Sequence, residues 1–161
     1  MNAPANIDHA ALCNLELEQE VLGAALVTNS AFEVIERAVS AGDFYEPLHS
    51  QLFETFANVH ASHGIITPAL VIASMGGDAS VIVAEGTTLS QYIARLAGAA
   101  SIPRNATAYA KQIREFSNRR KILATAETMS IAIKANQPAA DIAGGAIELL
   151  DEIAMAASTG Y

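Results

Sequence analysis

Residues 104–157 read RNATAYAKQIREFSNRRKILATAETMSIAIKANQPAADIAGGAIELLDEIAMAA, and this stretch decides the fold. It contains neither Gly nor Pro up to Gln137, and Pro138 then interrupts it. Proline lacks a backbone N–H and clashes with the preceding helical turn, so it ends one helix and can open the next. The sequence therefore predicts a long antiparallel helical hairpin.

Two neighbouring apolar stripes run along each arm of this hairpin. The first arm carries Tyr109, Ile113, Phe116 and Leu123 on one stripe, and Ile122, Ala126, Met129 and Ile133 on the other. The second arm carries Ile142, Ala146, Leu149, Ile153 and Ala156 on one stripe, and Ala143, Ile147, Leu150 and Ala154 on the other. A single partner helix needs an apolar face of about 100°, so the wider face indicates a second partner. We expect a second copy of the hairpin, which completes a two-fold symmetric four-helix bundle; packing on the chain's own head is the alternative.

The residues before the hairpin predict several short helices. Caps, prolines and glycines place these at about 15–27, from Ser30 to before Gly42, from Pro47 to Gly64, from Pro68 to Met75 and from Thr88 to Ala97. Ser30 and Glu33 have the spacing of a capping box. Residues 79–86 fit either a short strand or a helical turn, and we expect a helical or irregular segment because no partner strand is evident.

These patterns predict a chain in four parts. Residues 1–14 form a flexible tail, residues 15–101 a globular head, residues 102–157 the hairpin that serves oligomerisation, and residues 158–161 the start of a linker. The predicted fold class is all-α, a compact helical head followed by a long antiparallel helical hairpin.

Charge is distributed unevenly in a chain whose formal net charge is −8. Residues 1–101 hold two basic and eleven acidic side chains, whereas residues 102–134 hold seven basic and two acidic ones. Four of the basic residues, Arg114, Arg119, Arg120 and Lys121, are candidates for contacts with a partner or with nucleic acid. A solvated helix face, or a surface complementary to an acidic neighbour, is the reading we favour.

The usual motifs of catalysis and cofactor binding do not occur in the sequence. There is no Gly-x-x-x-x-Gly-Lys-Ser/Thr loop, no Gly-x-Gly-x-x-Gly fingerprint and no Gly-x-Ser-x-Gly elbow. His60 and His63 can share a helix face, but a lone pair falls short of a zinc ligand set. Cys13 is the single cysteine, and we expect a reduced thiol. We therefore expect no catalytic, cofactor-binding or metal-ligating residues, and no enzyme activity.

Hydropathy gives an expectation for the location of the protein. No window holds the 18 or more consecutive apolar residues typical of a membrane span, and residues 1–11 lack the basic region and apolar run of a signal peptide. We expect a cytoplasmic protein without a membrane partner.

Two motifs resemble a known family. The first is Leu15-Glu16-Leu17-Glu18-Gln19-Glu20-Val21-Leu22-Gly23, and the second is Asp43-Phe44-Tyr45 followed by His49, Leu52 and Phe53. In this order and spacing they resemble the N-terminal domain of DnaB-type replicative DNA helicases of bacteria, phages or plasmids. The resemblance extends from Leu15 over nearly the whole chain, although the hairpin part alone is a weak match.

The resemblance implies a non-catalytic scaffold for DNA replication. In that family the hairpins pair into dimers, three dimers close into a collar on the motor domains, and the collar receives primase. The implied partners are a second copy of the chain, primase, the motor domain and a helicase loader. ATP and Mg²⁺ belong to the motor domain of the full-length helicase. This chain would be either a piece of such a helicase or a stand-alone relative, and strong DNA binding by the chain alone is not expected.

Six large apolar residues are our candidates for the pairing surface: Tyr109, Ile113, Phe116, Ile142, Leu149 and Ile153. Two other functions remain as alternatives. One is the helicase-binding domain of a primase, whose fold is similar, and the other is a nucleic-acid-binding helical module that uses the four basic candidates.

Overall fold

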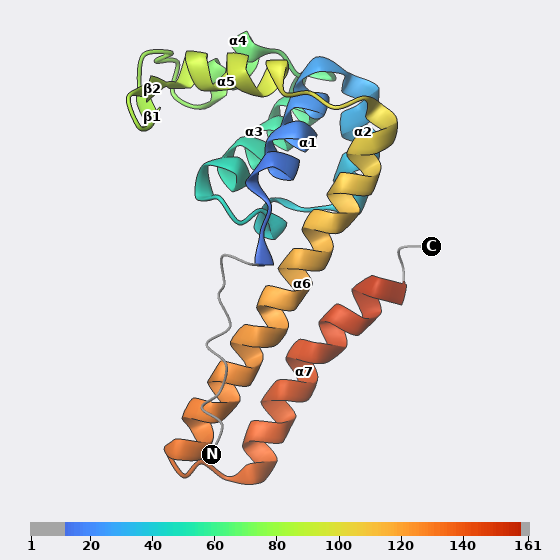
Figure 1. Ribbon diagram of the computed structural model, residues 1–161, viewed down its shortest axis with the longest axis vertical. Helices are drawn as coiled ribbons and strands as arrows, with labels where there is room; N and C mark the ends of the chain where they lie inside the picture. The colour runs from blue at the N-terminus through green and yellow to red at the C-terminus, as the bar shows by residue number, and fades with distance from the viewer. Residues whose placement is uncertain (1–11, 159–161) are drawn as a thin grey trace. The chain divides into compact units, whose positions relative to one another are not determined.

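Seven α-helices and one two-stranded antiparallel sheet make up residues 12–158, the part of the chain that the computed structural model describes (Figure 1). The elements are α1 (Leu15–Val27), α2 (Asn29–Ala38), the 3-10 helix η2 (Ala41–Asp43), α3 (Pro47–His63), α4 (Pro68–Ser74), β1 (Ile82–Ala84), β2 (Thr87–Thr88), α5 (Leu89–Gly98), α6 (Pro103–Lys134) and α7 (Ala139–Ser158). The predicted all-α class is confirmed. The predicted tail and linker lie almost entirely outside the described residues.

Local signals set most of the helix ends. Asn14 caps α1 by accepting a hydrogen bond from the Leu17 N–H at 3.2 Å, and Thr67 caps α4 in the same way. Pro47 lies at the start of α3, where its missing N–H costs nothing. Gly64 ends α3 with φ +72°, a left-handed conformation that favours glycine. These boundaries agree with those predicted.

Helix α2 begins earlier and ends earlier than predicted. Thr28 closes α1 and also precedes the first turn of α2, so Ser30 lies inside the helix and its predicted capping box with Glu33 is wrong. At the other end, Val39 is extended and only 1% exposed. The helix therefore ends at Ala38, before Gly42, and the chain continues as a buried extended segment.

The segment around Gly86 is a small β-hairpin, and our expectation of a helical or irregular segment is wrong. β1 pairs with β2, with Ile82 opposite Thr88, and Gly86 has φ +67° in the turn between them. The partner strand is only two residues long and lies directly before α5. Thr88 ends β2 and also caps α5, through reciprocal hydrogen bonds with Gln91.

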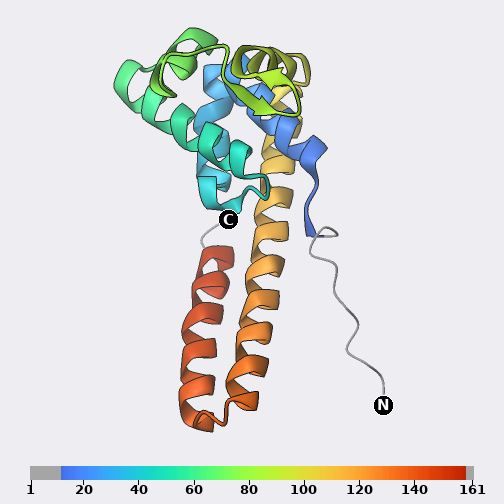
Figure 2. The ribbon, with the colours of Figure 1, turned by 90° about the vertical axis from the view of Figure 1, so that its left-hand side faces the viewer.

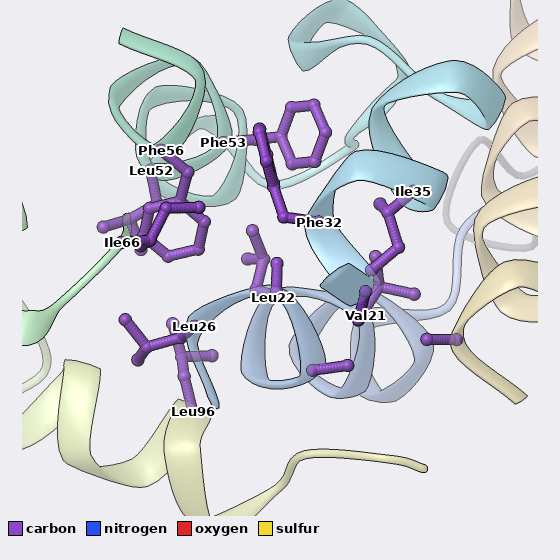
Figure 3. Packing of buried hydrophobic residues seen from close by; sticks show 14 of the residues in the cluster. Val21, Leu22, Leu26, Phe32, Ile35, Leu52, Phe53, Phe56, Ile66 and Leu96 are labelled. Carbon is purple, nitrogen blue, oxygen red and sulfur yellow. The ribbon is translucent and has the colours of Figure 1, made fainter. Parts of the chain in front are cut away.

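The core of the head is built around α1, which packs against α2, α3 and α5. Figure 3 shows Leu22 and Leu26 of α1 facing this core, with Phe32 and Phe53 beside each other between α2 and α3. The ring centroids of these two phenylalanines are 5.6 Å apart. Close packing of these side chains fixes the positions of the loop residues described below.

The head unit extends further along the chain than predicted. Residues 13–115 form one compact unit, so its boundary lies after Glu115 rather than after Ser101. The first turns of α6 belong to this unit because Ala106, Ala110 and Ile113 are buried in its hydrophobic core.

The second unit contains the hairpin of α6 and α7, from Phe116 onward. The two helices lie side by side and antiparallel in both views (Figures 1 and 2). Asn136 has φ +54° in the turn between them, and α7 begins directly after Pro138. The hairpin predicted from Pro138 is therefore present.

None of the described helices alone is long and apolar enough to cross a membrane. Only α3 and α4 taken together reach that length and composition, as a pair bent by 106°.

Candidate functional site

A chain of buried polar side chains connects α1, α3 and α5 inside the head. The Glu18 carboxylate lies 2.6 Å from Nδ1 of His49, and Nε2 of His49 lies 2.7 Å from the Tyr92 hydroxyl. Glu18 and His49 are each 1% exposed, and Tyr92 is 5% exposed. Buried polar groups of this kind are costly unless each finds a partner, and here they satisfy one another.

The directions of these hydrogen bonds follow from the chemistry of the groups. A carboxylate only accepts, so Nδ1 of His49 donates to Glu18. Burial raises the pKa of the Tyr92 hydroxyl, while a hydrogen bond with Gln19 acts in the opposite direction. Tyr92 therefore keeps its proton and can donate it to Nε2 of His49.

Glu18 also holds the loop that precedes α3. Its two carboxylate oxygens accept hydrogen bonds from the backbone N–H groups of Tyr45 at 2.7 Å and Glu46 at 3.3 Å. One side chain of α1 thus fixes a loop nearly thirty residues further along the chain. The two motifs noted in the sequence therefore contribute to the structure of the head, because Glu18 lies in the first motif and His49 in the second.

Asp43 forms a second buried contact in the head. One of its carboxylate oxygens accepts from the N–H and the hydroxyl of Ser40, and from Nε of Arg114 at 2.7 Å. Asp43 is 1% exposed, so the positive charge of Arg114 offsets the cost of burying its carboxylate. Arg114, a candidate for partner contacts, therefore has a structural role within the head.

Gly23 lies where α1 meets the end of α5. A Cβ atom built on Gly23 would be 2.1 Å from the carbonyl oxygen of Leu96 and 2.8 Å from the backbone N of Ala100. Both neighbours are backbone atoms, so they cannot turn away as a side chain could. Only glycine permits this close approach of the two helices.

The remaining three basic candidates do not share one side of α6. Arg119 and Lys121 are exposed, and Arg120 donates to the carbonyl oxygen of Leu12 at 2.7 Å. Successive residues of a helix point about 100° apart, so this run cannot present three cations to one phosphate backbone. The geometry does not favour the nucleic-acid module.

The six candidates for the pairing surface have different environments. Ile113 is 2% exposed within the head core, and Tyr109 packs against that core, because this part of α6 belongs to the head. Phe116, Ile142 and Ile153 are half-buried, whereas Leu149 is 48% exposed. Ile113 is therefore unavailable to a partner, while a pairing role for the others stays a prediction.

Other large apolar side chains of the hairpin are also exposed. Those that belong to the neighbouring stripes are Ile122 (46% exposed), Ile133 (61%), Ile147 (58%) and Leu150 (40%). The sequence marks both stripes with the same spacing, so periodicity alone could not show which of these side chains would be exposed. We call the side formed by these four residues the apolar face.

The next residues to consider are the histidines near the end of α3 and the single cysteine. The His60 ring lies 5.1 Å from the Phe32 ring, and its Nε2 lies 3.9 Å from the Glu33 carboxylate. Cys13 is half-buried. Within residues 12–158, no three His, Cys, Asp or Glu side chains come together as metal ligands.

Together, the fold and its buried polar contacts define an all-α domain whose motif residues hold the head together. The family model of the DnaB-like helicase N-terminal domain matches residues 10–115, more than half of the chain. The chain therefore belongs to the family of DnaB-like helicase N-terminal domains. The match ends at the last residue of the head unit.

A solved structure supports the same fold over more of the chain. The crystal structure of the N-terminal domain of DnaB helicase from Mycobacterium tuberculosis is similar with a TM-score of 0.74 and 19% sequence identity. The similarity covers 88% of this chain and 97% of that one. A comparison with curated proteins gave no match. The resemblance noted from the sequence is confirmed.

Proposed function

We propose that this domain is an oligomerisation and partner-docking module of a replicative helicase, in which the hairpins of two copies pair through the apolar face. The observation that supports this proposal is the exposure of Ile122, Ile133, Ile147 and Leu150 in the single chain. Large apolar side chains gathered on one side of a protein are typical of an interaction surface.

Helix geometry brings the two stripes to the same side of the hairpin. Residues offset by 4, 7 and 11 positions lie within about 60° of one another in a helix of 3.6 residues per turn. The stripe from Ile122 to Ile133 and the stripe from Ala143 to Ala154 both have these offsets. Buried Thr125 on α6 and buried Ala146 on α7 mark the sides on which the helices face each other. Each stripe is turned in the same sense from that side, so in antiparallel helices the two stripes form one surface.

Burial of the apolar face would offset much of the free-energy cost of pairing. Fully burying one large apolar side chain contributes roughly 1.5 to 3 kcal/mol, and these residues are already about half covered. Four residues from each of two copies would therefore contribute on the order of 6 to 12 kcal/mol. Association costs about 4 to 15 kcal/mol in lost freedom of motion, so we expect a dimer that depends on protein concentration.

Docking of other proteins is the second part of the proposal. Family membership makes primase the first partner to test, with the motor domain and a helicase loader as further partners. In this proposal ATP and Mg²⁺ act in the motor domain, and the present domain contributes assembly and docking in the cytoplasm.

Replacing Ile147 with glutamate is expected to weaken the dimer by about a hundredfold, because the substitution removes a large apolar contact from each copy and adds a charge. Sedimentation equilibrium over a range of concentrations measures this change. The matched control is Ile131→Glu, which alters a residue of α6 that is 67% exposed and lies outside both stripes. We expect this control to pair like the unaltered chain.

Two results would contradict the pairing proposal. The first is an unaltered chain that stays strictly monomeric at about tens of micromolar. The second is an equal loss of pairing in both variants, which would mean that the apolar face is not the specific contact.

A further inference from the structure

We propose that the outer edge of β1 is a docking edge for an extended segment of a partner protein that carries both apolar and basic side chains. This proposal does not depend on the pairing of hairpins. The edge lies in the head unit, where β1 and β2 form a small sheet beside α5 (Figure 1).

The register of the sheet shows which backbone groups face outward. The N–H of Leu89 donates to the carbonyl oxygen of Val81 at 2.8 Å, and Ile82 lies opposite Thr88. In an antiparallel pair this pattern makes Ile82 and Thr88 a non-hydrogen-bonded pair. The N–H and C=O of Ile82 therefore point away from β2, toward the position of a third strand.

The side chains at this edge favour addition of a strand. Ile82 is 61% exposed and Val81 is 47% exposed. Exposed strand edges are usually protected by lysine, by proline or by a covering element. β1 reads Ile82-Val83-Ala84 and contains neither lysine nor proline. It is a short strand whose register shifts between Ile82 and Ala84, so the docking edge consists of Ile82 and its exposed neighbour Val81. This apolar edge fits the recognition mode in which a peptide extends a sheet.

Two acidic side chains beside β1 indicate that the partner segment carries basic side chains. Asp78 and Glu85 are exposed on either side of the strand. Hydrogen bonds from Ser80 lower the pKa of the Asp78 carboxyl, so it is charged at neutral pH. If β1 paired antiparallel with β1 of a second copy, centred on Ile82, Asp78 of one copy would lie near Glu85 of the other. Parallel pairing would also set like charges side by side, so a basic segment fits better than a second copy.

Titration of the isotope-labelled full chain with a hexapeptide of alternating lysine and valine tests the proposal by NMR. We expect chemical-shift changes concentrated in residues 79–88, and slowed hydrogen exchange at the Ile82 N–H. Binding should weaken as salt rises, because the lysines pair with exposed carboxylates. The comparison peptide alternates glutamate and valine, and we expect it to bind at least about tenfold more weakly because it repels the same carboxylates.

Matched variants separate this edge from general hydrophobic contact. Ile82→Ser is expected to weaken binding of the lysine peptide about tenfold, since an apolar contact is lost. Ile65→Ser alters another head isoleucine, 46% exposed and outside the sheet, and should leave binding unchanged. Equal binding of the two peptides, equal effects of the two variants, or shifts centred outside residues 79–88 would each overturn the proposal.

Discussion

Glu18→Ala is expected to lower the free energy of unfolding of the head by about 4 kcal/mol, one of the two largest effects of a single substitution that the structure predicts. The change removes the acceptor for three donors, which are the N–H groups of Tyr45 and Glu46 and Nδ1 of His49. All three would remain near a site that is 1% exposed, where water cannot easily replace the carboxylate. Urea unfolding followed by circular dichroism measures the loss.

Two further variants calibrate this expectation. Tyr92→Phe removes only the hydroxyl at the other end of the network and should cost about 1 to 2 kcal/mol. Glu54→Ala removes an exposed carboxylate from α3 and should change stability by less than about 0.5 kcal/mol. If Glu18→Ala behaved like Glu54→Ala, the buried network would not be what holds the loop before α3.

Gly23→Ala is expected to destabilise the head by about 3 kcal/mol, although it adds only one methyl group. That group would lie 2.1 Å from the Leu96 carbonyl oxygen, so α1 and the end of α5 would have to separate. Separation opens the core around Leu22 and Leu96, both fully buried. Chemical unfolding and hydrogen exchange of α5 amides report the two parts of this effect.

The control for this substitution is Gly98→Ala. Gly98 lies at the last position of α5, and nothing approaches within 4 Å of a Cβ built there. Alanine favours helix over glycine, so this variant should be neutral or more stable by up to about 1 kcal/mol. Similar losses in the two variants would contradict the role of close helix packing at Gly23.

Residues with strong local signals explain why most of the fold was predictable. Pro47, Pro68 and Gly64 each act within one helical turn, so their consequences can be read from neighbouring residues alone. Pro138 separates α6 from α7 for the same reason. Two of the errors arose where a local signal was overridden or too short to recognise. Thr28 took the place of Ser30 as the cap, and β1 found a partner of only two residues.

The buried network was not predictable, because its members are far apart in the sequence. Glu18 and Tyr92 come together only through His49, which belongs to a third helix. The resemblance to a family pointed to Glu18 and His49 without giving them a role. The burial of Ile113, one of the pairing candidates, was missed for a related reason, since helical spacing cannot show which side of α6 the head covers.

The position of α1 at the centre of the head has a consequence for synthesis of the chain. Leu22 is translated early, but Leu96 of α5, which belongs to the same hydrophobic core, follows more than seventy residues later. At a translation rate of about 5 to 20 residues per second, the apolar side of α1 stays uncovered by α5 for roughly 4 to 15 seconds. Nascent chains that end before Tyr92 should therefore be cut readily by protease, while chains whose residues through Glu115 have left the ribosome should resist. The first helix to be translated therefore stays partly uncovered until most of the head has followed it.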